Sequence, residues 1–133
     1  MGSARNTVAH GAHISAAGGV PLGPQRAEDI GASAMQIFTK QPNRWAERDV
    51  EADEAKAFQA AVKASGGRFT NAHDSYLINL ASPDPVLRAK SIESFAAELR
   101  RCHGLGGDAC VAHPGNGGEG GGRGGGGRAG GGV

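Results

Sequence analysis

The sequence lacks the features that mark membrane and secreted proteins. No apolar run approaches the ~20 residues that a membrane-spanning helix needs, and no charged segment followed by an apolar one opens the chain as a signal peptide would. The two cysteines, Cys102 and Cys110, are too few for a disulfide framework, and their spacing fits no usual zinc knuckle. We therefore expect a soluble, cytoplasmic protein that does not bind a membrane.

An excess of charge of one sign is also missing. The chain has 14 Lys and Arg residues against 13 Asp and Glu residues, so its formal net charge is +1. A protein that holds nucleic acid through a strongly basic overall field is excluded, although a local basic patch is not. With 133 residues, the chain is long enough for one domain.

Glycine, in contrast, is abundant and unevenly placed. The chain has 24 glycines, about 18% against the usual ~7%, and 13 of them fall within the 19 residues from Gly115 to Val133. Residues 1–114 have an ordinary globular composition. We expect residues 115–133 to form a disordered tail, because they have too little apolar surface to offset the ordering entropy.

The first 114 residues alternate between strand-like and helix-like patterns. The strand-length apolar stretches are Thr7–Ile14, Ala34–Thr39, Arg68–Ala72 and Ala109–Ala112. The helical stretches are Gly23–Ile30, Val50–Ala64 and Pro85–Leu105. This alternation predicts an α/β fold with four parallel strands, about half of an eightfold barrel. The last strand should then have an unpaired edge.

Two histidines stand directly after predicted strands. His73 follows the third strand and His113 follows the fourth. The carboxyl ends of barrel strands meet on one face, and neighbouring strands lie about 4.8 Å apart, so both imidazoles can reach one zinc ion. Spacing alone also fits a helix entry at His73 and a turn at His113. The pattern leaves both interpretations open.

The neighbours of these histidines carry a more specific signal. Four motifs occur in order: Gly11-Ala-His-Ile-Ser-Ala-Ala-Gly-Gly19, Phe38-Thr-Lys-Gln-Pro-Asn-Arg-Trp45, His73-Asp-Ser-Tyr-Leu-Ile-Asn-Leu80 and His113-Pro-Gly115. Together they resemble the endonuclease IV family, the zinc-dependent apurinic/apyrimidinic endonucleases of DNA repair. The resemblance extends over residues 8–115.

The resemblance implies a (β/α)8 TIM barrel, of which this chain has the first half. Family members act as monomers on double-stranded DNA with abasic sites, and hydrolyse the phosphodiester 5′ to the lesion. Three zinc ions at the strand ends lower the pKa of a water and neutralise charge on the phosphate. By motif, His73 and His113 correspond to two zinc ligands. No catalytic residue separate from the metal ligands is implied.

The resemblance also assigns DNA contacts and one residue that lines the site. Tyr76 and Leu77 match residues that the family inserts into damaged DNA, where an aromatic ring beside an aliphatic wedge replaces lost stacking. The loop after the second strand is implied to touch DNA through Lys40, Arg44 and Trp45. Asn43 stands where the family often has Arg, so Arg44 comes one position late. His13 is expected to line the site through a hydrogen bond.

The resemblance stops after the His-Pro-Gly motif. Beyond His113 the sequence has no further His or Asp, and its one acidic residue is Glu119. We expect an N-terminal fragment, produced by a frameshift or a mis-predicted gene end, that is inactive alone and binds zinc at most weakly. The alternatives are a sugar-phosphate isomerase/epimerase-like barrel, or a non-catalytic nucleic-acid-binding fragment that uses the Arg-Gly tail.

Overall fold

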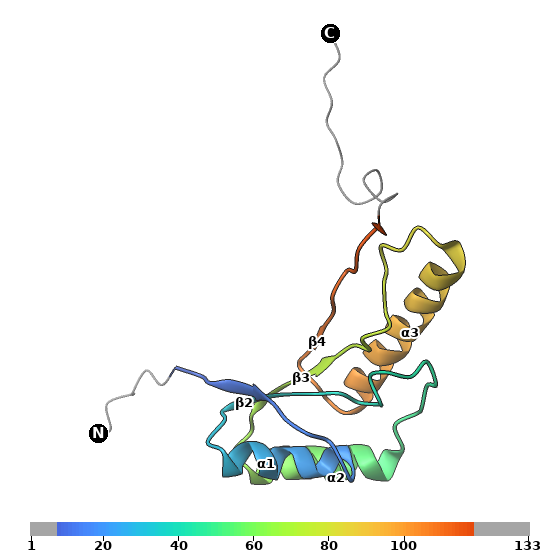
Figure 1. The fold of residues 1–133 in the computed structure, drawn as a ribbon. Helices are drawn as coiled ribbons and strands as arrows, with labels where there is room; N and C mark the ends of the chain where they lie inside the picture. Colours follow the sequence, from blue (N-terminus) through green and yellow to red (C-terminus); the bar gives the residue numbers. More distant parts are fainter. Residues whose placement is uncertain (1–7, 119–133) are drawn as a thin grey trace.

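The framework of the protein is a parallel four-stranded sheet. The computed structural model describes residues 8–118. Its strands lie in the order β1-β2-β3-β4, and each pairs with the next in parallel (Figure 1). Their bounds are β1 Gly11–His13, β2 Ala34–Ile37, β3 Phe69–His73 and β4 Ala109–Val111. The predicted α/β fold with four parallel strands is confirmed.

Three α-helices connect the strands, as the sequence predicts. They are α1 Gly23–Asp29, which a short 3-10 turn at Val20–Leu22 precedes, α2 Ala52–Ala64 and α3 Pro85–Gly104. In Figure 1, α1 and α2 lie side by side under the sheet, and α3 runs along β3 and β4. The main difference is in β1, which pairs over three residues rather than the whole of Thr7–Ile14.

The hydrophobic core lies between the sheet and the helices. Strand residues alternate between the two faces, so Met35 and Ile37 point to the helices while Ala34 and Gln36 point away. The core consists of Ile14, Val20, Ala27, Ala32, Met35, Ile37, Phe58 and Leu105. This one-sided core fixes which strand residues face the opposite surface, where the site described below begins.

The second face of the sheet has no covering layer within residues 8–118. Phe69 on this face is 52% exposed, and β1 and β4 each pair with a strand on one side only in this part of the chain. In a closed barrel, this face is the interior and these two edges are paired. The predicted unpaired edge at β4 is therefore present.

Helix α3 buries a mainly polar face and leaves several large apolar side chains exposed. Val86, Ile92 and Leu99 are exposed. The residues buried against the rest of the protein are Ser91, Ser94, Glu98, Arg101 and Cys102. The reason is a set of ion pairs and hydrogen bonds with the loop that follows β2, described below.

The start of α3 yields a stability prediction. The Asp84 carboxylate accepts a hydrogen bond of 2.9 Å from the N–H of Val86, and Pro85 occupies the first turn. Asp84→Ala should lower the free energy of unfolding by about 1 kcal/mol. Urea titration followed by circular dichroism measures this. Glu93→Ala, at an exposed position inside the same helix, is the control, and an equal loss in both variants would argue against the cap.

One prediction from the sequence extends beyond the described residues. The tail predicted at residues 115–133 lies outside the described residues from position 119 onward, so its disorder stays a prediction. Within residues 8–118, no helix is both long and apolar enough to span a bilayer.

Candidate metal centre and nucleic-acid interface

His73 and His113 meet at the carboxyl ends of β3 and β4. His73 is the last residue of β3, and it pairs in register with Val111 of β4. The N–H of Asp74 donates to the carbonyl of Val111 over 3.0 Å, which continues the pairing one residue further. The two imidazole Nε2 atoms are 3.1 Å apart, and their ring centroids are 5.0 Å apart. The structure thus brings the two predicted ligands together.

The geometry of this pair suits one zinc ion. Two nitrogens at ~2.0–2.1 Å from a tetrahedral zinc are about 3.4 Å apart, so a small shift of either ring would admit the metal. The Nδ1–H of His73 donates to the carbonyl of Asp74 over 2.8 Å. With the proton on Nδ1, the lone pair of His73 Nε2 faces His113 Nε2, and zinc would replace the hydrogen bond between the two nitrogens. The residues present fit a zinc site with two protein ligands.

Asp74 adds a buried carboxyl group beside the histidines. It is 2% exposed, its Oδ1 lies 3.5 Å from His73 Nδ1, and its Oδ2 has no hydrogen-bond partner among the described residues. Burial raises the pKa of Asp74, and the neighbouring His73 and His113 oppose that rise. Sequence reasoning missed this residue. Its only signal was its place next to His73 at a strand end.

No third ligand completes the pair within residues 8–118. In that part of the chain, no three His, Cys, Asp or Glu side chains come close enough together to hold a metal ion. His103 is exposed in the last turn of α3, and His10 is exposed before β1. His73 and His113 are therefore the pair that geometry singles out among the described histidines.

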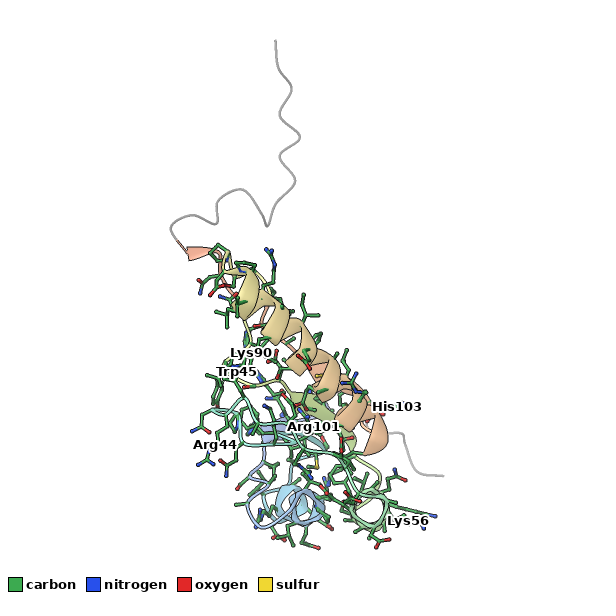
Figure 2. All side chains as sticks on the ribbon, turned by 90° about the vertical axis from the view of Figure 1, so that its right-hand side faces the viewer. Arg44, Trp45, Lys56, Lys90, Arg101 and His103 are labelled. Carbon is green, nitrogen blue, oxygen red and sulfur yellow. The ribbon has the colours of Figure 1, made fainter. Side chains whose placement is uncertain are left out.

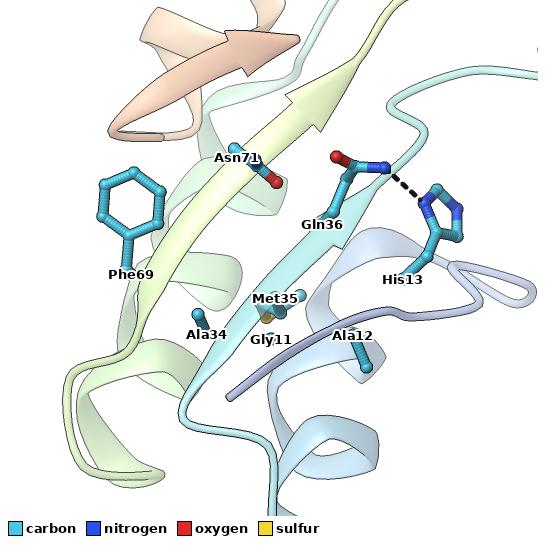
Figure 3. A pocket seen from close by; sticks show the side chains of 8 residues that line it. All are labelled: Gly11, Ala12, His13, Ala34, Met35, Gln36, Phe69 and Asn71. Carbon is cyan, nitrogen blue, oxygen red and sulfur yellow. Dashed lines mark hydrogen bonds between the residues drawn. The ribbon is translucent and has the colours of Figure 1, made fainter. Parts of the chain in front are cut away.

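His13 lines a cavity on the uncovered face of the sheet. The cavity has a volume of about 240 Å³, and Figure 3 shows His13 at one end of it, with Gln36 between His13 and Asn71. The amide Nε2 of Gln36 donates to His13 Nδ1 over 3.0 Å, which requires a neutral ring (Figure 3). Burial, and then the charge on His73, lower the pKa of His13. His13 thus lines a cavity and accepts a hydrogen bond, and its role in a functional site stays a prediction.

Aromatic rings connect His13 to the metal pair and to Tyr76. Phe38 lies 4.6 Å from His13, 5.5 Å from His73 and 5.1 Å from Tyr76, measured between ring centroids. Tyr76 is 68% exposed and meets Phe38 at an interplanar angle of 73°, so most of its side chain is open to solvent. Leu77 beside it is half-buried. An open aromatic face next to an aliphatic side chain can stack against a nucleobase.

The loop after β2, residues 40–48, holds the remaining predicted DNA contacts. Arg44 is exposed, and Trp45 is half-buried with the ammonium of Lys90 4.6 Å from its ring centroid (Figure 2). Lys40 differs, because its side chain is 4% exposed and its Nζ pairs with Glu47 at 3.1 Å. The structure brings Arg44 and Trp45 to the surface, and it does not bring Lys40 there.

A buried charge network connects this loop to α3, and sequence reasoning missed it. Glu98 is 1% exposed, and it accepts hydrogen bonds from Thr39 Oγ1 and Arg101 Nη2, each over 2.6 Å. Arg101, 3% exposed, also donates to Thr39 over 2.8 Å and to Glu47 over 2.5 Å. Charged residues at i and i+3 of a helix are ordinary surface features, so no sequence pattern signals that this pair is buried.

Comparison with known proteins identifies the family to which this fold belongs. A family model described as a xylose isomerase-like TIM barrel matches residues 24–128, which is most of the chain. The chain belongs to the xylose isomerase-like TIM barrel family. The half-barrel interpretation of the four parallel strands is thus confirmed.

Within this TIM barrel family, the similarity points to endonuclease IV. A protein named probable endonuclease 4 from Chloroflexus aggregans is 48% identical over 105 residues, covering 79% of this chain and 37% of the relative. A namesake from Thermoplasma acidophilum is 44% identical over 106 residues, covering 80% of this chain and 38% of that protein. The chain therefore spans less than two fifths of the length of these relatives.

A solved structure supports the same relation. The crystal structure of endonuclease IV from Thermus thermophilus matches with a TM-score of 0.78 and 38% identity, covering 83% of this chain and 41% of that one. The resemblance to endonuclease IV stated from the motifs is confirmed. The roles of the individual site residues stay predictions.

Proposed function

We propose that this chain carries the N-terminal site residues of a zinc-dependent apurinic/apyrimidinic endonuclease, which hydrolyses the phosphodiester 5′ to an abasic site in double-stranded DNA. The observation that carries the proposal is the approach of His73 Nε2 and His113 Nε2 to 3.1 Å at the strand ends. The relatives named probable endonuclease 4 and the crystal structure of endonuclease IV support the same reaction class.

His73 and His113 would hold one zinc ion through Nε2. Zinc bound there would lower the pKa of a water and neutralise charge on the phosphate. Asp74 would keep the imidazole of His73 oriented, since its carbonyl accepts a hydrogen bond from Nδ1–H and its buried carboxyl lies 3.5 Å from the same nitrogen. His13, neutral and hydrogen-bonded to Gln36, would present a donor at Nε2 to the DNA backbone.

The DNA would contact the same edge of the sheet. Tyr76 is exposed and contacts Phe38, which also contacts His73. Arg44 is exposed on the neighbouring loop. An abasic site removes one base from the stack, and an aromatic ring beside Leu77 can occupy the gap. The family description also fits sugar isomerases. A small sugar, however, has no base stack into which an exposed aromatic side chain could insert, so Tyr76 favours a DNA substrate.

By itself the 133-residue chain is expected not to cleave DNA. Two histidines supply half of the four ligands that zinc usually takes, so the metal should bind weakly and exchange readily. A cytoplasmic location and a monomeric state stay predictions.

Incision of an abasic duplex tests the proposed function. We would compare the chain with a chimera, in which residues 1–115 are joined to the part of the Chloroflexus aggregans relative that follows its matching segment. The chimera should nick the duplex 5′ to the lesion, in a manner sensitive to chelator, and the chain alone should not. Chelator-sensitive nicking by the chain alone that His73→Ala abolishes would overturn the two-ligand argument. A folded chimera without any incision would overturn the proposed function.

The same chimera gives a prediction for the aromatic wedge. Tyr76→Ala should reduce the preference for abasic over intact duplex about tenfold, because stacking on one base contributes ~1–3 kcal/mol. Competition binding with the two duplexes measures this preference. Leu99→Ala, an exposed apolar position on α3, is the control and should leave it unchanged. Equal effects of the two substitutions would remove Tyr76 from the DNA interface.

A further inference from the structure

We propose that Lys40 is a positioning residue, which holds residues 41–47 in the conformation that presents Arg44 and Trp45 to DNA. The motif resemblance implied a direct contact of Lys40 with DNA, whereas its contacts in the structure are all within the chain. The purpose of this positioning role rests on the proposed DNA-binding function. The contacts of Lys40 do not depend on that function, because all of them lie within the chain.

The ammonium of Lys40 already has a full set of acceptors. An ammonium group has three N–H donors. Around Lys40 Nζ lie the carbonyl of Arg44 at 2.7 Å, the carbonyl of Ala46 at 3.2 Å and Glu47 Oε1 at 3.1 Å. With its side chain 4% exposed, Lys40 could reach a DNA phosphate only by giving up these partners. The two carbonyls flank Trp45, so Lys40 fixes the backbone on both sides of the exposed turn.

Glu47 fastens the same loop to α3. Its Oε1 accepts from Ser94 Oγ over 2.6 Å, and its Oε2 accepts from Arg101 Nη1 over 2.5 Å. Burial by itself would raise the pKa of Glu47, but hydrogen bonds from Ser94, Arg101 and Lys40 outweigh it and hold the pKa below its usual value. The carboxylate therefore stays ionised between two cations, and Lys40 is connected through it to the buried network of α3.

Two further contacts hold the outer part of the loop. The ammonium of Lys90, on α3, stands over the ring of Trp45. The carbonyl of Pro42 accepts from the N–H of Tyr76 over 3.0 Å and from Ser75 Oγ over 2.6 Å. The loop is thus joined to the segment that carries the aromatic wedge. Arg44 and Tyr76 belong to one fixed surface, and a surface that is ordered before binding loses less entropy when DNA docks.

The test uses the whole 133-residue chain without DNA. Trp45 is the only tryptophan, so its fluorescence reports on this loop alone. Lys40→Met should speed hydrogen exchange of the Arg44 and Tyr76 amides, whose N–H groups donate to the carbonyls of Gln41 and Pro42 in this loop, about tenfold or more. The reason is that it removes the hydrogen bonds of a charged donor, and it should also shift the Trp45 emission. Lys56→Met, at an exposed position on α2 away from Trp45 in Figure 2, makes the same change of charge and should alter neither signal.

Glu47→Gln keeps the proposal testable if Lys40→Met fails to fold. Glu47 is partly exposed, so the substitution is mild, and it should speed exchange in the same residues by a smaller factor. Unchanged exchange and emission in the folded Lys40→Met variant, or in Glu47→Gln if that is the only folded one, would overturn the positioning role.

Salt-dependent binding of an abasic duplex separates positioning from direct contact. Arg44→Gln should reduce the slope of log K against log salt by about 1, as expected for loss of one phosphate contact. Lys40→Met should weaken binding and leave the slope unchanged. A slope reduced equally by both substitutions would overturn the assignment. If the wild-type chain and the chimera both bind no duplex, the proposed function fails, and the hydrogen-exchange result alone decides the role of Lys40.

Discussion

Replacing Arg101 by methionine should lower the free energy of unfolding by about 3–5 kcal/mol, the usual cost of removing one partner from a buried ion pair. Arg101 is 3% exposed and donates to Glu98, which is 1% exposed, over 2.6 Å. Without the guanidinium, the Glu98 carboxylate would stay buried with only Thr39 as a hydrogen-bond donor. Since small domains have a free energy of unfolding of only about 5–15 kcal/mol, this substitution would remove a large share of the stability.

The neighbouring arginine supplies a matched control. Arg100 is exposed on the same helix, and Arg100→Met makes an identical change of charge and volume. It should alter the free energy of unfolding by no more than about 0.5 kcal/mol. The double variant Glu98→Gln with Arg101→Met should recover part of the loss, because it no longer leaves a buried charge unpaired. Urea titration of the four proteins gives the comparison, and equal losses from Arg100→Met and Arg101→Met would contradict it.

The second large effect concerns zinc. His113→Ala should weaken zinc binding by the 133-residue chain about 100-fold, because structural zinc sites with four ligands have apparent binding free energies of ~10–16 kcal/mol, or ~2.5–4 kcal/mol for each ligand. The substituted side chain is exposed, so the fold should be little affected. Competition with a chromophoric chelator measures the affinity.

A histidine elsewhere in the chain serves as the control for this loss. His103 is exposed at the end of α3, next to the start of β4, whereas His113 follows the end of that strand. His103→Ala should leave zinc affinity unchanged. If His103→Ala and His113→Ala weaken binding equally, zinc binds to the chain without a defined site.

Local sequence patterns were sufficient to predict the elements of this fold. The Gly66-Gly67 pair marks the end of α2, where both residues adopt a positive φ of 98° and 71°. Asp84 and Pro85 mark the start of α3. Between these boundaries, short apolar stretches alternate with helical ones, and this alternation determines parallel pairing. The bounds of β1 were less predictable, because only Gly11–His13 finds a partner in β2.

The histidine pair was predictable for a related reason. Parallel strands end on the same side of a sheet, so a histidine directly after each of two neighbouring strands must come near the other. The register of His73 opposite Val111 brings the two strand ends together, where the two Nε2 atoms lie 3.1 Å apart. What the pattern could not give is Asp74, since its burial depends on packing across several segments.

The role of the loop after β2 could not be predicted from sequence. Lys40, Glu47 and Arg101 are separated by up to 61 positions, and nothing local distinguishes them from exposed charges. The orientation of α3 could not be predicted either. Ile92 and Leu99 are exposed, because Glu98 and Arg101 take the buried side. Long-range ion pairs decided the packing here.

The most direct test of the zinc site is anomalous diffraction at the zinc edge, from crystals of the 133-residue chain soaked in zinc. We expect one anomalous peak at about 2.0–2.1 Å from the Nε2 atoms of both His73 and His113, with the Nδ1 of His73 still hydrogen-bonded to the carbonyl of Asp74. A structure with the two imidazoles turned apart, or with zinc bound only at other histidines such as His10 or His103, would contradict it.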